Sequence, residues 1–128
     1  MNKIGSYLDF HAQALALRSR RNEMLASNIA NAATPNFKAR DIDFDAEMKK
    51  HVKVGPIQTT HDKHFPTTVN PMPDRMLFRE PINPSLDGNT VELAVEQMEF
   101  SENVMRYQTT LNFLNNRIAG LMSAIRGE

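Results

Sequence analysis

The side chains best suited to chemistry are three histidines in the central part of the chain, His51, His61 and His64. Imidazole nitrogens bind zinc, so a metal-dependent hydrolase would require these three side chains to converge. Two loop histidines three residues apart, with no further established ligand, are weak evidence for a metal. We therefore interpret them as solvated loop residues and expect no metal site and no cofactor. Stoichiometric zinc after dialysis would favour the hydrolase alternative.

Acidic residues also alternate with apolar ones at Asp41, Asp43, Asp45 and Glu47. A calcium-binding loop needs a glycine near its sixth position, and this segment has none. We predict that these carboxylates form the polar face of an extended segment. The sequence contains no glycine-rich phosphate loop, nucleophile elbow or metal-binding helix motif. It therefore predicts a protein that is not an enzyme and has no catalytic residues and no small-molecule substrate.

Charge and composition narrow the classes of partner. The 128 residues include 15 basic and 15 acidic side chains, so no one-signed field draws the chain to nucleic acid or an anionic bilayer. The absence of cysteine excludes disulfides and thiolate chemistry. Residues 1–10 have no long apolar block, which argues against a cleaved signal peptide. We expect a single domain without nucleic-acid partners.

The distribution of proline divides the chain into three parts. All seven prolines lie between Pro35 and Pro84, so only the flanks can form long helices. In the N-terminal flank, steps of three and four residues define a heptad seam, Ile4, Leu8, His11, Leu15, Arg18, Asn22, Leu25, Ile29 and Ala32. A second row beside it comprises Phe10, Ala14, Leu17, Arg21 and Met24. The pair Thr34-Pro35 ends this helix because the residue before proline avoids the helical region.

The C-terminal flank carries the more regular stripe, Leu93, Gln97, Phe100, Val104, Tyr107, Leu111, Leu114, Ile118, Leu121 and Ile125. Asn89 is a candidate helix cap, and Glu92, three residues later, can complete a capping box. The pattern predicts one helix of roughly 50 Å.

These features predict a mainly α fold. Residues 1–33 and 90–128 would form two long terminal helices that pack as an antiparallel coiled-coil-like pair in one discontinuous helical domain. Residues 34–89 would form an extended and irregular segment with a small β-hairpin, for which the β-prone stretches are 52–54 and 76–78.

Each predicted helix has a second apolar row, which on the C-terminal helix is Val91, Val95, Met98 and Met105. A two-helix monomer would leave these rows in water. Either the middle segment covers them or copies of the chain bury them against each other, and we favour the copies. The predicted packing residues are Leu8, Leu15, Leu25, Ile29, Phe100, Val104, Tyr107, Leu111, Leu114, Ile118 and Leu121.

Residues 25–37, LASNIANAATPNF, resemble the N-terminal signature of flagellar rod and hook axial proteins, in which an asparagine-rich helix end runs into Thr-Pro-Gly-Tyr. The motif positions here are Asn28, Asn31, Thr34, Pro35, Asn36 and Phe37. Asn36 replaces the usual glycine but tolerates a left-handed turn, and Phe37 keeps the ring of the usual tyrosine without its hydroxyl. Residues 38–44, 87–92, 107–108 and 124–127 are similar to the proximal-rod members of this family.

The resemblance implies a structural subunit of the proximal rod of the flagellar basal body. Such a protein is exported by the flagellar type III apparatus without a cleaved signal, and it assembles in the periplasm as a torque-transmitting helical tube. The resemblance also implies that residues 34–89 face outward from this tube. Its implied partners are copies of itself, the rod proteins FlgC and FlgF, the FliE adaptor and the basal-body ring. Phe10, Ala14 and Leu15 could form an export-recognition element, for which ordinary packing is an equally good explanation. The alternative is a cytoplasmic coiled-coil adaptor, which should be a discrete dimer.

Overall fold

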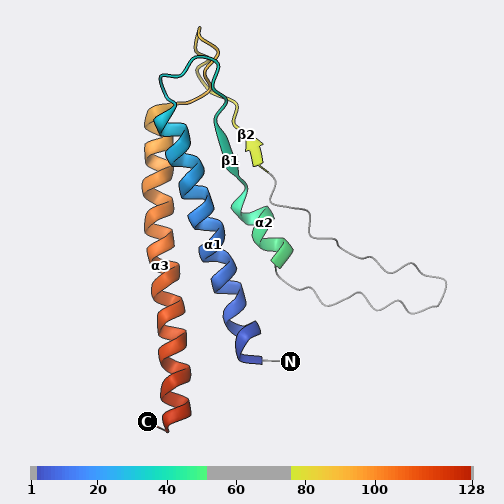
Figure 1. Cartoon of the computed structure of the whole chain (residues 1–128), viewed down its shortest axis with the longest axis vertical. Helices are drawn as coiled ribbons and strands as arrows, with labels where there is room; N and C mark the ends of the chain where they lie inside the picture. The colour runs from blue at the N-terminus through green and yellow to red at the C-terminus, as the bar shows by residue number, and fades with distance from the viewer. Residues whose placement is uncertain (1–2, 52–75, 128) are drawn as a thin grey trace, which may run out of the picture.

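The computed structural model describes residues 3–51 and 76–127. The elements, in chain order, are α1 (Lys3–Ala30), β1 (Arg40–Ile42), α2 (Phe44–His51), β2 (Met76–Phe78) and α3 (Leu93–Arg126). Helices α1 and α3 run antiparallel and side by side, with β1 and α2 next to α1 (Figure 1). The predicted pairing of two long terminal helices is confirmed.

Helix α1 ends at Ala30, three residues before the predicted end at residue 33. A tight turn over residues 34–37 follows, in which the backbone N–H of Phe37 donates to the carbonyl of Thr34 at 3.3 Å. Asn36 has a φ of 60°, the left-handed conformation predicted for it. Local residue chemistry therefore determines how the chain leaves α1.

Helix α3 begins at Leu93, and the predicted capping box is wrong. Glu92 occupies the cap position, but its side chain makes no capping hydrogen bond. Its carboxylate instead accepts from the backbone N–H groups of Ile82 and Asn83, at 3.3 and 3.2 Å. At the other end, Gly127 adopts a left-handed φ of 78° and its N–H bonds to the carbonyl of Ser123, which closes the helix.

Strands β1 and β2 pair antiparallel, with Arg40 opposite Phe78 and Ile42 opposite Met76. Residues 76–78 are thus a strand, as predicted. Their partner is residues 40–42, which we had not expected to pair. The other predicted strand, residues 52–54, lies outside the described residues.

Helix α2 corrects the expectation of an extended acidic segment. Asp43 Oδ1 accepts from the N–H of Ala46 at 3.0 Å, and acidic side chains in the first turn complement the helix dipole. Phe44 and Met48 are four residues apart, so a helix places both on one face. The alternation of apolar residues fitted a strand equally well, and packing against α1 selected the helix.

The apolar core lies between α1 and the β1–α2 segment. Its buried members are Ala14, Leu17, Ile42 and Met48, with Met24 and Phe44 packed against them. From Ala14 onward, the second apolar row of α1 is therefore covered by the middle of the same chain, while Phe10 stays 46% exposed. Our preference for other copies of the protein as the cover was wrong for this row.

Candidate assembly interface

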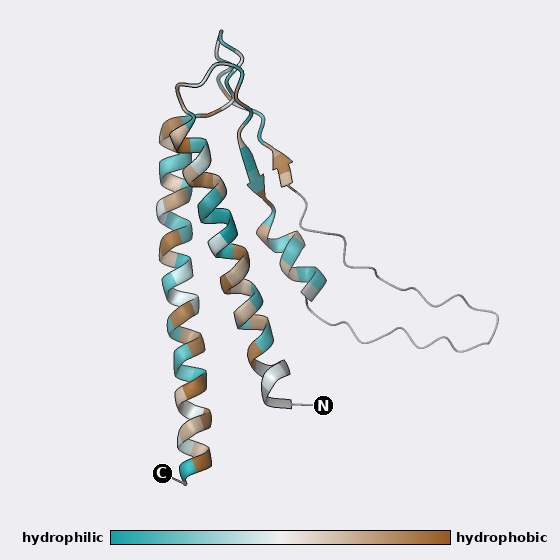
Figure 2. Cartoon of the chain, in the orientation of Figure 1, coloured by the Kyte–Doolittle hydropathy of each residue, from teal (hydrophilic) through white to brown (hydrophobic). Residues whose placement is uncertain are grey.

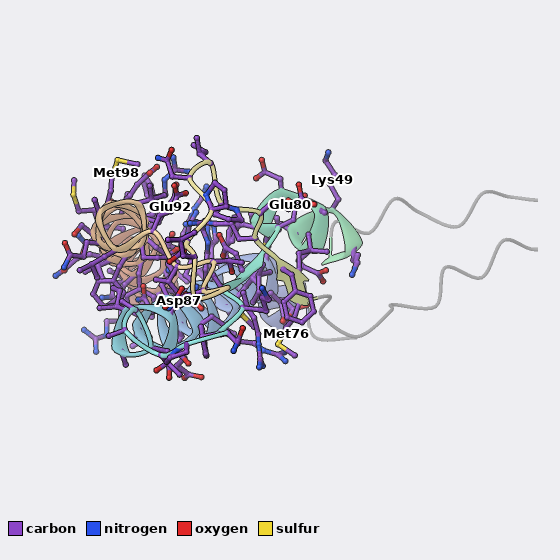
Figure 3. All side chains as sticks on the ribbon, turned by 90° about the horizontal axis from the view of Figure 1, so that it is seen from above. Lys49, Met76, Glu80, Asp87, Glu92 and Met98 are labelled. Atoms are coloured by element: carbon purple, nitrogen blue, oxygen red, sulfur yellow. The ribbon has the colours of Figure 1, made fainter. Side chains whose placement is uncertain are left out.

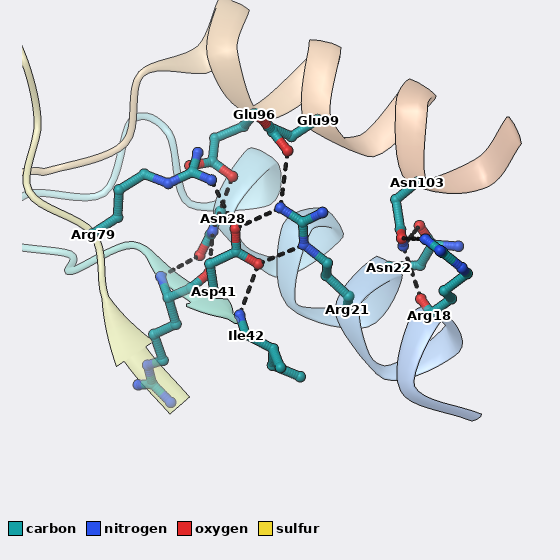
Figure 4. Close-up of polar contacts among 11 residues, drawn as sticks. Arg18, Arg21, Asn22, Asn28, Asp41, Ile42, Arg79, Glu96, Glu99 and Asn103 are labelled. Atoms are coloured by element: carbon teal, nitrogen blue, oxygen red, sulfur yellow. Dashed lines mark hydrogen bonds and ion pairs between the residues drawn. The ribbon is translucent and has the colours of Figure 1, made fainter. Parts of the chain in front are cut away.

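A network of charged side chains joins α1, the small sheet and α3 (Figure 4). Arg21 donates from Nε and Nη2 to the two carboxylate oxygens of Asp41, at 2.8 Å each, and from Nη2 to Glu99 at 2.8 Å. Arg79 donates to Asp41 at 2.7 Å and to Glu96 at 2.9 Å. The bidentate Arg21–Asp41 pair has the geometry of the stronger charge-assisted hydrogen bonds. The network fixes the sheet relative to both long helices.

The contact between Arg21 and Asp41 favours the charged form of both side chains. Burial alone would raise the pKa of Asp41, but the hydrogen bond from Arg21, the N–H of Ile42 and the two guanidinium charges lower it below its usual value. The pKa of Arg21 is raised, first by its hydrogen bond to Asp41. Both groups are therefore charged throughout the physiological pH range.

Asn28, the first asparagine of the motif, is a tertiary anchor. Its side chain is 1% exposed. Nδ2 donates to the Arg40 carbonyl at 2.8 Å and to Glu96 Oε2 at 3.0 Å, while Oδ1 accepts from the Arg40 N–H at 3.1 Å. Asparagine amides near a helix end often bond to carbonyls that the helix leaves free. Asn31 makes such a contact, donating to the carbonyl of Ser27 at 2.8 Å, whereas Asn28 bonds to residues distant in the chain.

Asn89 closes the C-terminal end of α1, a role that the sequence did not reveal. Its Nδ2 lies within hydrogen-bonding distance of the carbonyls of Asn31, Ala32 and Thr34, at 3.1, 2.9 and 3.0 Å. Its Oδ1 accepts from the N–H of Val91 at 2.8 Å. The sequence showed only an asparagine near a predicted helix start, which equally well predicted a helix cap.

In the rest of the motif, Thr34, Pro35 and Asn36 are exposed and Phe37 is half-buried.

Lower in the helix pair, Asn103 connects α3 to α1. It is fully buried, and its Nδ2 donates to the Arg18 carbonyl and to Asn22 Oδ1, both at 2.8 Å. The Arg18 guanidinium lies 4.0 Å from the centroid of the Phe44 ring, which continues the contact into α2. Arg18 and Asn22, two polar residues of the predicted α1 seam, therefore contact Asn103.

The predicted packing residues differ in burial. Leu25 is fully buried, and Val104 and Ile118 are 37% and 41% exposed. The others are half-buried, namely Leu8, Leu15, Ile29, Phe100, Tyr107, Leu111, Leu114 and Leu121. The buried side chains of α3 are the polar Glu96 and Asn103. Within one chain, polar contacts thus fill the most enclosed positions of α3, and most of its apolar stripe keeps part of its surface accessible.

Apolar residues recur along the length of α3 (Figure 2), and several of their side chains are exposed. Met98 is 60% exposed and Met105 is 71% exposed, while Val91 and Val95 of the same predicted row are half-buried. Viewed from above, Met98 lies on the side of α3 that faces away from α1 (Figure 3). Phe113, at 57%, continues the exposed apolar surface. This surface is the candidate assembly interface.

The predicted export element lies within α1. Phe10 is 46% exposed and packs edge-on against His11, with ring centroids 5.7 Å apart. Ala14 belongs to the core and Leu15 is half-buried. The fold therefore gives Ala14 a packing role, and an export role stays a prediction.

For the metal hypothesis, His61 and His64 lie outside the described residues, as does the side chain of His51. Within residues 3–51 and 76–127, no group of three or more potential ligand side chains is placed to hold a metal ion. Over the same ranges, no helix combines the length and apolarity needed to cross a membrane.

Comparison with known proteins identifies the family. A family model described as "Flagella basal body rod protein" matches residues 8–38. The chain is 59% identical to the flagellar basal body rod protein FlgB of Cereibacter sphaeroides, over 94% of each chain. It is 42% identical to FlgB of Yersinia enterocolitica over 98% of each chain, and 40% identical to FlgB of Escherichia coli K12 over 98% of this chain and 97% of that one. Because these similarities extend over nearly the whole sequence, the chain belongs to the FlgB family of flagellar basal body rod proteins.

Proposed function

We propose that this chain is a structural subunit of the flagellar rod and that the exposed apolar face of α3 is the surface through which it assembles. The observation that carries the proposal is the contrast between two faces of α3. The face toward α1 buries Glu96 and Asn103 in hydrogen bonds, whereas Met98 and Met105 on the outside are 60% and 71% exposed.

The burial pattern supports assembly because a rigid scaffold presents an incompletely buried apolar surface. Large exposed apolar patches on a soluble chain mark interaction sites. Charged and amide contacts hold α1, α3 and the sheet in place, so an assembling subunit would have less conformational entropy to lose. Burial of each methionine against a neighbour would stabilise the assembly by roughly 1.5 to 3 kcal/mol.

The finer description rests on the family similarity. The subunit lies in the proximal rod, on the periplasmic side, in a tube built with further copies and with FlgC and FlgF. It adjoins the FliE adaptor and the basal-body ring, reaches this place through the type III export apparatus, and transmits torque through packed helices. The cytoplasmic adaptor alternative is not favoured by the comparisons, since the similar proteins named above are rod proteins.

The test compares two double variants in cells that lack the native gene. Met98→Glu with Met105→Glu places charge on the exposed face, and Met98→Leu with Met105→Leu keeps it apolar. Since both positions are exposed, each purified variant should retain native helicity and unfolding temperature. We expect the glutamate variant to be exported but to form no rod and give no swimming, and the leucine variant to swim. Normal swimming by cells with the glutamate variant would refute the proposed surface.

A further inference from the structure

Methionine is the side chain of this protein that oxidants attack most readily. The sequence has eight methionines and neither cysteine nor tryptophan, so the thioethers hold its only sulfur atoms. Hydrogen peroxide converts methionine to methionine sulfoxide, and an exposed sulfur reacts before a buried one. The positions of the exposed methionines therefore decide what oxidation does to the chain.

Two exposed methionines lie on the surface through which the subunit is proposed to assemble. Met98 and Met105 are separated by about two turns of α3, so they lie on one helix face, and they are 60% and 71% exposed. Met98 lies on the side of α3 that faces away from α1 (Figure 3). By contrast, Met48 is 7% exposed and Met24 packs against the core. In the free subunit, the fold leaves the two outer sulfur atoms accessible and shields the two inner ones.

Oxidation changes an outer methionine without changing the contacts that hold the helices together. The sulfoxide oxygen stays hydrated on the free subunit, and α3 is joined to α1 by hydrogen bonds of Glu96 and Asn103 on its opposite face. Against the apolar surface of a neighbour, the same oxygen would be buried without a hydrogen-bond donor. Each sulfoxide should therefore lower the association constant about tenfold.

We infer that Met98 and Met105 make the outer face of α3 an oxidation-sensitive site, where conversion to sulfoxide blocks assembly of the subunit and reduction restores it. In the oxidation, hydrogen peroxide transfers one oxygen atom to Sδ, which loses two electrons, and the remainder of the peroxide leaves as water. In the reverse step, the dithiol of a methionine sulfoxide reductase becomes a disulfide and the oxygen leaves as water. The inference rests on the proposed function and adds to it a means of regulating the same surface.

Peptide mass spectrometry of the purified chain tests the reactivity of the site. During treatment with hydrogen peroxide, we expect sulfoxide to form at Met98 and Met105 several-fold faster than at Met48, with no change in helicity by circular dichroism. Methionine sulfoxide reductases for the two sulfoxide epimers should then restore both side chains. Equal rates at the outer positions and at Met48 would overturn the inference, as would a loss of helicity that accompanies oxidation of the outer pair.

Cells that lack the native gene test the effect on assembly. They produce the native chain, the double variant Met98→Leu with Met105→Leu, or the double variant Met98→Gln with Met105→Gln, whose amide resembles a sulfoxide in length and polarity. We expect the glutamine variant to be folded and exported, and to give at least about tenfold fewer assembled rods and swimming cells. Brief exposure to peroxide while rods assemble should lower the number of swimming cells several-fold with the native chain and much less with the leucine variant.

Other outcomes separate this inference from the proposed function. If Met98→Glu with Met105→Glu prevents swimming and the glutamine variant swims normally, the surface assembles the rod but tolerates a sulfoxide, so only the inference fails. If the glutamate variant also swims, both fail. An equal loss of swimming under peroxide with the native chain and with the leucine variant would overturn the inference alone.

Discussion

Replacement of Asn28 by aspartate gives the sharpest test of the polar junction. The substitution exchanges a donor amide for an oxygen in a side chain that is 1% exposed. It removes the donations to the Arg40 carbonyl at 2.8 Å and to Glu96 at 3.0 Å, and it places two carboxylates in contact. The acceptance from the Arg40 N–H is kept. Volume hardly changes, so any effect reports hydrogen bonding and charge.

The magnitude follows from these contacts. Loss of a buried hydrogen bond that leaves its partner unsatisfied costs about 1 to 3 kcal/mol, and an uncompensated buried charge costs about 3 to 5 kcal/mol. Arg79, which donates to Glu96 at 2.9 Å, offsets part of the repulsion. We expect Asn28→Asp to lower the free energy of unfolding by roughly 3 to 4 kcal/mol near neutral pH. Asn28→Ala, which adds no charge, should cost about 1 to 3 kcal/mol.

The pH dependence separates the two effects. Burial and the Glu96 charge raise the folded-state pKa of the introduced carboxylate above its unfolded value. The folded variant then binds more protons than the unfolded variant. Its loss of unfolding free energy relative to the native protein therefore shrinks as pH falls from neutral toward that raised pKa. The loss of unfolding free energy caused by Asn28→Ala should change little over this range.

Urea unfolding of the purified chain, followed by circular dichroism at about pH 7 and about pH 5, measures these differences. Addition of Glu96→Gln to Asn28→Asp should recover part of the loss, because an amide can donate where the carboxylate could not. A deficit below about 0.5 kcal/mol at neutral pH, within the range of ordinary surface substitutions, would refute the reasoning. So would a deficit that grows as pH falls.

Further predictions follow from other contacts. Because the folded-state pKa of Asp41 is lowered, this carboxylate stabilises the native chain above its unfolded pKa of about 3.9, and the contribution is lost as pH falls through the folded pKa. Asp41→Asn should remove this contribution, so the free energy of unfolding should fall less steeply with decreasing pH in the variant. Gly88→Ala should destabilise the folded chain by about 1 to 2 kcal/mol, because Gly88 has a φ of 75° and the added Cβ would lie 2.6 Å from Asn36 Oδ1. Thermal unfolding measures this loss, which should be smaller in a chain that also carries Asn36→Gly. Leu114→Asp should abolish rod assembly and swimming, and a swimming variant would contradict the packing role of this half-buried residue. Phe10→Ala should reduce secretion if the side chain acts in export, whereas undiminished secretion of a folded variant would assign Phe10 to packing alone.

Local patterns predicted the elements whose causes are local. The confinement of proline to residues 35–84 and the heptad spacing located both long helices, with ends within three residues of those observed at Ala30 and Leu93. The left-handed Asn36 followed from its position after proline in a turn. The periodicity could not tell strand from helix at residues 44–48, because apolar residues there suited both repeats, and contact with α1 made the difference.

The polar junction depended on contacts across the chain. Nothing in the sequence marks Asn28, Asn89, Glu96 or Asn103 as buried, yet all four are buried. The hydrogen bond between Asn28 and Glu96 spans 68 residues of chain, and that from Asn103 to Arg18 spans 85. The residue type shows that a polar side chain needs hydrogen-bond partners. It does not show whether water or a distant residue provides them.

The sequence by itself determined that two long helices flank a proline-containing segment, that a left-handed turn ends the first helix, and that the chain resembles rod proteins. The tertiary structure decided that β1 and α2 cover most of the second row of α1, that polar side chains occupy the enclosed positions of α3, and that the outer face of α3 stays apolar and accessible. The division is physical: helix periodicity and turn geometry arise from neighbours a few residues apart, whereas burial and hydrogen-bond partners arise only when distant segments meet.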